Sequence, residues 1–351
     1  LVLAFPAVAA VTSASEIRLA VIQGFALEIN EDFIEENGTD LAAAITIPQL
    51  TMKFSTGTEL ETPHVNQFSL GFDRRFGQHA ALRVDFKRVD GYDLPIYKDL
   101  KPVNCIPDLD DPLSNPACIG IPGHPDPTTG SIAAIVTNGR SWYEAVDVNW
   151  RGARDLSWIS AGYTCSEAED LGPDPLKGGI ALPPDSTNIR GVRARADGDR
   201  RHRVVVSGDF PVAWGGLRGS AVVQYMSGIP FNVTTGSDDN FDGIKSDRPD
   251  GIGRNTGEDT PLSVVNALRI EDGLAPVANL KEPEFYQVDL RLYRSFELAK
   301  GRAQVYAQIF NLFDRVNPGL IEGRVLARNF GRTITLAGPP RTVEAGLKFD
   351  Y

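Results

Sequence analysis

From Val65 onward, stretches in which apolar and polar residues alternate recur between turns and long polar loops. A period of two is typical of β-strands, whose side chains point to opposite faces in turn. Within 284–297, for example, Val288 and Leu290 stand on one row and Asp289 stands between them on the other. The pattern predicts nine strands, at 66–76, 80–90, 142–150, 155–165, 201–210, 217–228, 284–297, 302–310 and 341–351. The chain is therefore expected to be all-β.

The connections between these strands alternate strictly between tight and long. The tight ones lie around Gly77, around Gly152, at Pro211–Gly216 and at Ala299–Gly301. The long ones cover 92–139, 167–199, 229–283 and 314–340. Short turns on one side and long loops on the other are typical of outer-membrane barrels, whereas loops of this length are uncommon in compact soluble domains.

A soluble antiparallel sandwich or propeller would also contain alternating strands, but with short connections at both ends. In a sandwich, Arg83, Asp85 and Lys87 would be buried charges, whereas a wet barrel lumen tolerates them. Aromatic residues also lie at or near strand ends, where an interfacial girdle would be: Trp142, Tyr143, Trp150, Phe210, Tyr225, Phe296 and Tyr351. We therefore expect an antiparallel transmembrane β-barrel segment with short periplasmic turns and long extracellular loops.

Composition and charge agree with this expectation and exclude two other classes. The 351 residues are 42% hydrophobic and carry a net charge of −11, which argues against a nucleic-acid partner. No apolar run reaches the roughly 18 residues that a membrane-spanning helix needs. Membrane strands escape this test because their apolar residues stand at every second position.

Residues 1–60 do not follow the strand pattern. The apolar run Leu1–Val11 has no preceding Met, Lys or Arg, so we interpret it as the interior of a longer protein rather than as a signal peptide. Glu16–Glu36 could form an amphipathic helix, and 43–54 a strand or part of a loop. The expected division is an uncertain region at 1–60 and barrel at 61–351.

Eight stretches, in this order, resemble one protein family. They are Thr62–Gly71 (TPHVNQFSLG), Asn138–Tyr143 (NGRSWY), Tyr163–Asp170 (YTCSEAED), Asp199–Arg203 (DRRHR), Ser227–Phe231 (SGIPF), Thr234–Pro249 (TTGSDDNFDGIKSDRP), Asn311–Gly319 (NLFDRVNPG) and Ala337–Tyr351 (AGPPRTVEAGLKFDY). Together they resemble the C-terminal part of TonB-dependent outer-membrane receptors, in the branch with a carboxypeptidase-regulatory-like N-terminal domain.

The resemblance implies a full-length protein with a 22-stranded barrel, an internal plug and a TonB box. This sequence would supply nine or more strands, about half of the barrel, and neither the plug nor the TonB box. It also implies TonB-dependent ligand uptake when full length, in the outer membrane of a Gram-negative bacterium. The implied partners are the TonB complex, through the missing N-terminal part, the outer-membrane assembly machinery, lipid, and a small or peptide-like ligand that the sequence does not identify. An adhesin-like or secretion-related barrel without active transport stays open as the alternative.

No catalytic constellation is visible in the sequence. The four histidines are scattered, and no G-x-S-x-G, Walker A, H-E-x-x-H or paired C-x-x-C motif occurs. We therefore expect no enzyme activity. Arg201 and Arg203 share one face of a strand and could line the lumen and attract an anionic ligand, but a structural ion-pair belt is the favoured interpretation.

The loop at 238–250 resembles the opening of a calcium loop, the one cofactor site that the sequence suggests. Its oxygen-bearing alternate positions are Asp238, Asn240 and Asp242. The twelfth position is Pro249 instead of Glu, so Asp247 or Asp250 would have to supply the last ligand. An acidic solvated loop with turn-forming side chains is an equally good interpretation.

Two further expectations concern covalent structure and assembly. Cys105 and Cys118 stand in one long loop that would be exposed to an oxidising compartment, which predicts a disulfide and leaves Cys165 unpaired. Phe349 and Tyr351 end the last strand on its apolar row, which resembles the signal read by the assembly machinery. The three C-terminal strands should then form a sheet whose last strand has an open outer edge.

Overall fold

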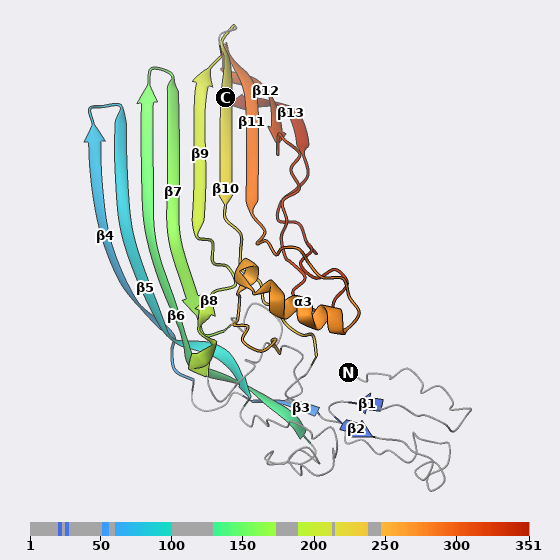
Figure 1. The fold of residues 1–351 in the computed structure, drawn as a ribbon. Helices are drawn as coiled ribbons and strands as arrows, with labels where there is room; N and C mark the ends of the chain where they lie inside the picture. The colour runs from blue at the N-terminus through green and yellow to red at the C-terminus, as the bar shows by residue number, and fades with distance from the viewer. Residues whose placement is uncertain are drawn as a thin grey trace.

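The computed structural model describes residues 20–22, 25–27, 51–55, 60–99, 129–172, 189–212, 215–237 and 247–350. Its main element is an eleven-stranded sheet, in which nine strands follow one another in chain order (Figure 1). They are β4 (His64–Phe76), β5 (Ala80–Asp99), β6 (Thr129–Arg154), β7 (Ser157–Asp170), β9 (His202–Pro211), β10 (Leu217–Met226), β11 (Phe285–Leu298), β12 (Gly301–Phe310) and β13 (Thr342–Asp350). The nine strands predicted from alternation are confirmed.

Each of these strands pairs antiparallel with the next one along the chain, from β4 at one edge to β13 at the other. Within the described part of the chain the sheet is open, because β4 and β13 do not meet. The expected sheet of β11, β12 and β13, with β13 at its outer edge, is therefore present.

The smaller elements lie beside this path. β8 (Ala194–Arg195) pairs with β7, and β3 (Thr51–Ser55) runs parallel to β6. β1 (Ala20–Ile22) and β2 (Phe25–Leu27) form a separate antiparallel pair, so these residues do not adopt the helix considered as one possibility for Glu16–Glu36. Their β-branched and aromatic side chains favour extended backbone, and the glycine between them disfavours a helix.

Two connections differ from the sequence-based expectation. The turn expected around Gly152 lies at Asp155 and Leu156, where Asp155 has a φ of 51°. Gly152 stays inside β6, because its missing side chain makes room for the ring of Trp150: a Cβ there would lie 2.6 Å from the indole. The long loop expected at 92–139 is also partly strand, since β5 and β6 continue into it after a register shift between Gly91 and Ile96.

The sheet has one apolar and one polar face, which the strand register carries across all nine strands. The apolar face includes Leu70, Phe72, Val84, Phe86, Val146, Val148, Val204, Val206, Val223, Val288, Leu290, Leu292, Val305, Ile309, Val343 and Leu347. The polar face includes Asp85, Lys87, Asp147, Asn149, Thr164, Ser207, Asp209, Ser220, Asp289, Arg291, Gln304, Gln308, Glu344 and Lys348. Large apolar side chains remain exposed on the first face, among them Leu70 at 66% and Leu347 at 64%, so this face requires an apolar surrounding.

The dimensions of the apolar face fit a membrane. Tyr286 and Phe296 mark its two ends on β11 and stand ten residues apart; the row between them is apolar except for Arg294, whose guanidinium lies over the ring of Phe296 at that end. At a rise of about 3.3 Å per residue and a tilt of about 40°, this segment spans about 25 Å, the height of the apolar band in outer-membrane barrels. Among the described residues, no helix is long and apolar enough to cross a membrane.

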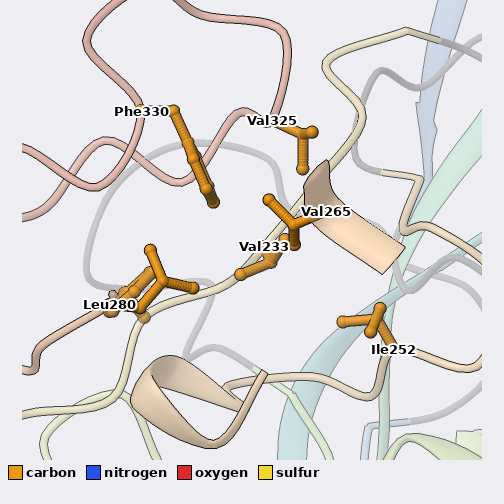
Figure 2. Packing of buried hydrophobic residues seen from close by; sticks show 7 residues of the cluster. Val233, Ile252, Val265, Leu280, Val325 and Phe330 are labelled. Carbon is orange, nitrogen blue, oxygen red and sulfur yellow. The ribbon is translucent and has the colours of Figure 1, made fainter. Parts of the chain in front are cut away.

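The largest buried core lies outside the sheet. We define the loop cap as residues 227–237 and 247–284, between β10 and β11, together with 311–341, between β12 and β13. It contains η3 (Gly257–Asp259) and α3 (Leu262–Glu271), while η2 (Ile189–Val192) belongs to the connection between β7 and β9. Seven buried residues form its core: Phe231, Val233, Ile252, Val265, Leu280, Val325 and Phe330 (Figure 2).

Candidate functional site: the loop cap

The cap lies at the long-loop ends of the strands, opposite the tight turns (Figure 1). Its helix α3 begins after Pro261 and turns Val265 and Arg269 inward, one helical turn apart on the same face. Val265 packs in the hydrophobic core, whereas Arg269 donates to the carbonyl oxygens of Val325 and Ala327. The helix therefore binds the two halves of the cap together with both apolar and polar contacts.

A second polar contact closes the cap around its helix. The side-chain amide of Asn266 donates to the carbonyl of Val277 at 3.0 Å, and its oxygen accepts from the Val277 amide at 2.8 Å. Both hydrogen-bonding groups of a half-buried amide are thus paired within the cap. This pins the segment after the helix, which supplies Leu280 to the core.

Arg254 connects the base of the cap to the connection between β7 and β9. Its side chain is only 4% exposed, and it forms an ion pair and a hydrogen bond with the carboxylate of Asp170 at the end of β7. It also donates to the carbonyl oxygens of Val192 and Ala194 and reaches Asp197 at 3.5 Å. Burial raises the pKa of Asp170, and the attraction of Arg254 offsets this rise only in part.

Arg195 makes a second link between the same two loops. Its guanidinium group donates to both carboxylate oxygens of Glu282, at 2.6 and 3.2 Å, and to Asp199 at 2.9 Å. Asp199 in turn accepts from the amide of Ala168 at 3.0 Å. Because Asp199 is buried, its carboxylate needs these partners.

A hollow of about 1180 Å³ separates the cap from the ends of the wall strands. Its wall side includes Val146, Cys165 and His202, which are cross-strand partners on the apolar face. The next cross-strand pair on this face of β6 and β7, toward the long loops, is Glu144 with Glu167, and it is charged. The change from apolar to charged residues marks the extracellular boundary of the membrane band.

Of the two predicted lumen arginines, Arg201 is engaged within the protein. It forms ion pairs with Glu167 at 3.0 Å and with Asp199 at 3.2 Å, as the ion-pair interpretation expects. Arg203 is exposed, and its register partner Thr164 places it on the polar face of the sheet. A role of either side chain in ligand binding stays a prediction.

The roles of Arg254, Asp170 and Glu282 were not predicted from the sequence. These residues come from a strand end and from loops that are distant in sequence, and pairing between such segments leaves no periodic signal. The one signal in the sequence that could have pointed to Arg254 is local composition. Residues 247–260 contain two arginines, Arg248 and Arg254, in a segment rich in turn-forming residues.

Several predicted residues lie outside the described residues, and their predictions stay open. They are Cys105, Cys118, Asp238, Asn240, Asp242 and Tyr351. Asp247 and Asp250 of the calcium loop are described: Asp247 is buried and its carbonyl accepts from the amide of Thr235, whereas Asp250 is exposed. The described part of the chain holds no group of three or more His, Cys, Asp or Glu residues that could bind a metal ion. Cys165 is an exposed free thiol, and Phe349 is exposed on β13.

An antiparallel wall with one apolar and one polar face, tight turns at one end and a packed loop cap at the other, defines the class of outer-membrane β-barrel proteins. The chain belongs to the outer membrane beta barrel domain family, whose model matches residues 4–344. The expected fold class and the expected outer-membrane location are thereby confirmed. No curated protein matches the sequence.

Three solved structures with similarity to the chain are transporters or receptors. The outer membrane transporter YddB from Escherichia coli is 12% identical with a TM-score of 0.48, and the match covers 84% of this chain and 34% of that one. BauA, the ferric preacinetobactin receptor from Acinetobacter baumannii, is 12% identical, with a TM-score of 0.43 and coverage of 82% and 29%. The FrpB iron transporter from Neisseria meningitidis is 10% identical, with a TM-score of 0.44 and coverage of 84% and 32%. The chain thus spans about a third of the length of these proteins.

Proposed function

We propose that the full-length protein is an outer-membrane receptor that takes up a ligand in a TonB-dependent manner. In this proposal the chain supplies one portion of the barrel wall and the extracellular cap that captures the ligand. The supporting observation is the asymmetry between the two ends of the wall. One end has only tight turns, whereas the other has long loops packed around a core of their own.

A packed cap has a physical advantage for capture. Ordering loops when a ligand arrives costs conformational entropy, and a cap that is already ordered has met that cost during folding. The paired residues Arg254 and Asp170 hold the cap against the wall before any ligand is present. Long loops that are ordered in this way generally carry function.

Two of the stretches that carry the resemblance to TonB-dependent receptors anchor this cap. Asn311 is almost fully buried, and its amide donates to the carbonyls of Arg315 and Pro339. Asn317 is equally buried and accepts from the backbone amide of Tyr286 at 2.9 Å. The motif NLFDRVNPG therefore holds the backbone at the junction between the wall strands and the cap. This structural role is a reason for a receptor family to share the motif.

Growth experiments test the proposal without knowledge of the ligand. A strain that lacks the gene and a strain that lacks TonB would be compared with the parent on a panel of iron chelates, glycans and peptides, each as sole source. The proposal expects at least one source on which both mutants fail and the parent grows. The proposal also expects the purified full-length protein to bind the periplasmic domain of TonB, which surface plasmon resonance would measure.

The adhesin-like or secretion-related alternative gives the opposite pattern. The gene-deletion strain would then grow on every source on which the TonB-deletion strain fails, and no binding to TonB would be measured. Either result alone would require revision, and both together would overturn the proposal.

A further inference from the structure

Arg248 differs from the other buried or half-buried arginines of the cap because one of its donors has no hydrogen-bond partner. It is half-buried, and its Nε atom is buried without a hydrogen-bond partner. The backbone around it is well held: the amide of Thr235 donates to the carbonyl of Asp247, and the amide of Ile252 donates to the carbonyl of Pro249. The guanidinium group is therefore placed there by an ordered main chain.

The other buried or half-buried arginines of the cap and its base are paired. Arg195 and Arg201 have carboxylate partners, Arg269 has carbonyl partners, and Arg200 donates to the carbonyl of Ser227 at 2.5 Å. Arg254, the arginine nearest in sequence to Arg248, uses its donors on Asp170 and on backbone carbonyls.

The surroundings of Arg248 work against its positive charge. Burial and, to a smaller extent, repulsion from Arg254 lower the pKa of its guanidinium group to about 10, and the attraction of Asp247 offsets only part of this shift. A shielded cation with an unused donor is costly, and an anion that accepts from it removes that cost. The side chain as a whole is half-buried, so part of it stays open to solvent although its Nε atom is buried.

We propose that Arg248 is a binding residue for an anionic group, a carboxylate or a phosphate, on a small molecule captured by the loop cap. A guanidinium group suits both anions, because its planar array of donors matches two of their oxygens at once. The proposal rests on the receptor function above and adds a chemical class to its ligand. The positive charge of the half-buried Arg248 disfavours a calcium ion at the same position, because like charges repel.

Such an anion could have two sources: a molecule from outside, or an acidic side chain of the neighbouring residues 238–246. Isothermal titration calorimetry on the full-length protein in detergent, in buffer without phosphate or carboxylates, separates the two. The probes are inorganic phosphate and citrate, and the variants are Arg248→Gln and Arg248→Lys. Arg328→Gln is the matched control, because Arg328 is an exposed arginine of the same cap.

We expect the wild type and Arg328→Gln to bind at least one probe, and Arg248→Gln to bind it about tenfold or more weakly, as expected for the loss of a charge-assisted hydrogen bond. Arg248→Lys keeps the charge without the planar donors and should bind with intermediate affinity. In the probe-free buffer, Arg248→Gln should melt at the same temperature as the wild type or higher, because it removes an unpaired cation.

Two results would overturn the proposal. The first is equal binding of the probes by the wild type and Arg248→Gln. The second is no binding of either probe by the wild type; a lower melting temperature of Arg248→Gln would then assign the guanidinium group to an internal carboxylate. Because calorimetry measures no transport, its outcome is independent of whether uptake requires TonB.

Discussion

The wall and the cap of this protein are stabilised in opposite ways. On the wall, large apolar side chains such as Leu70 and Leu347 stay exposed, because the membrane itself covers them. In the cap, Val233, Val265 and Val325 have no exposed surface at all. One chain thus builds a lipid-facing sheet with almost no internal core and, attached to it, a water-facing unit with an ordinary hydrophobic core. Apolar residues face lipid in the wall and form a buried core in the cap.

The wall and the cap also differ in which segments their polar contacts join. On the wall they join neighbouring strands, as between Gln308 and Glu344 at 2.6 Å. In the cap they join separate loops, as between Arg254 and Asp170, which are 84 positions apart. The wall is therefore held together locally, by one strand pair after another, whereas the cap depends on a few contacts between distant segments.

The largest expected effect comes from breaking one of these distant contacts. Arg254→Met keeps the length of the side chain but leaves the carboxylate of Asp170 without its cation. Removing one partner of a buried ion pair typically costs about 3–5 kcal/mol, so the cap should unfold at a lower temperature while the wall keeps its strands. Limited trypsin digestion would report the cap, and far-ultraviolet circular dichroism the wall.

The double variant Arg254→Met with Asp170→Leu is the control, because it removes both charges. It should recover much of the lost stability. Equal protease resistance of the wild type and Arg254→Met would show that the ion pair does not hold the cap.

A somewhat smaller effect is expected from placing charge on the apolar face of the wall. Leu292 lies well inside the apolar band of β11, and Leu292→Arg should cost about 2–4 kcal/mol in a bilayer. Gln304→Arg, on the polar face of β12, is the matched control and should cost little. Urea unfolding of the full-length protein in lipid vesicles measures both. Similar losses for the two variants would mean that the faces have been assigned wrongly.

The smallest expected effect is on how the stability of the cap changes at acidic pH. Hydrogen bonds from Arg324 lower the pKa of Glu322 in the folded cap, so this carboxylate contributes stability above the ordinary glutamate pKa of about 4.5. That contribution is lost as the pH falls through the lower folded value. Asp170 acts in the opposite direction, because burial raises its pKa and protonation on acidification relieves the cost.

Glu322→Gln should therefore reduce the acid-induced drop in the melting temperature of the cap, followed by near-ultraviolet circular dichroism from about pH 6 to pH 3. Gln cannot titrate, and the curve should flatten below about pH 5. Parallel curves for wild type and variant would exclude a role of Glu322 in the acid response.

The wall could be predicted from sequence because its rule is repetitive. The alternation around Val288 and Leu290 extends over whole strands, so each strand was visible by itself. The turn after β6 was displaced because Gly152 serves the ring of Trp150 and not a turn. The cap was not visible, because Val233, Val265 and Val325 come from segments without a common period and meet only in space.

The order of strands has a consequence for how the wall is made. Every strand from β4 to β13 pairs with its immediate neighbours along the chain, so the wall alternates short closures at its tight turns with long closures at β5–β6, β7–β9, β10–β11 and β12–β13. Such a sheet can grow one strand at a time, with each finished edge serving as the template for the next strand. The cap joins residues from both of its connections, so it can close only after β12 has formed and residues 311–341 have followed it. The connectivity therefore places closure of the cap late in the order of strands.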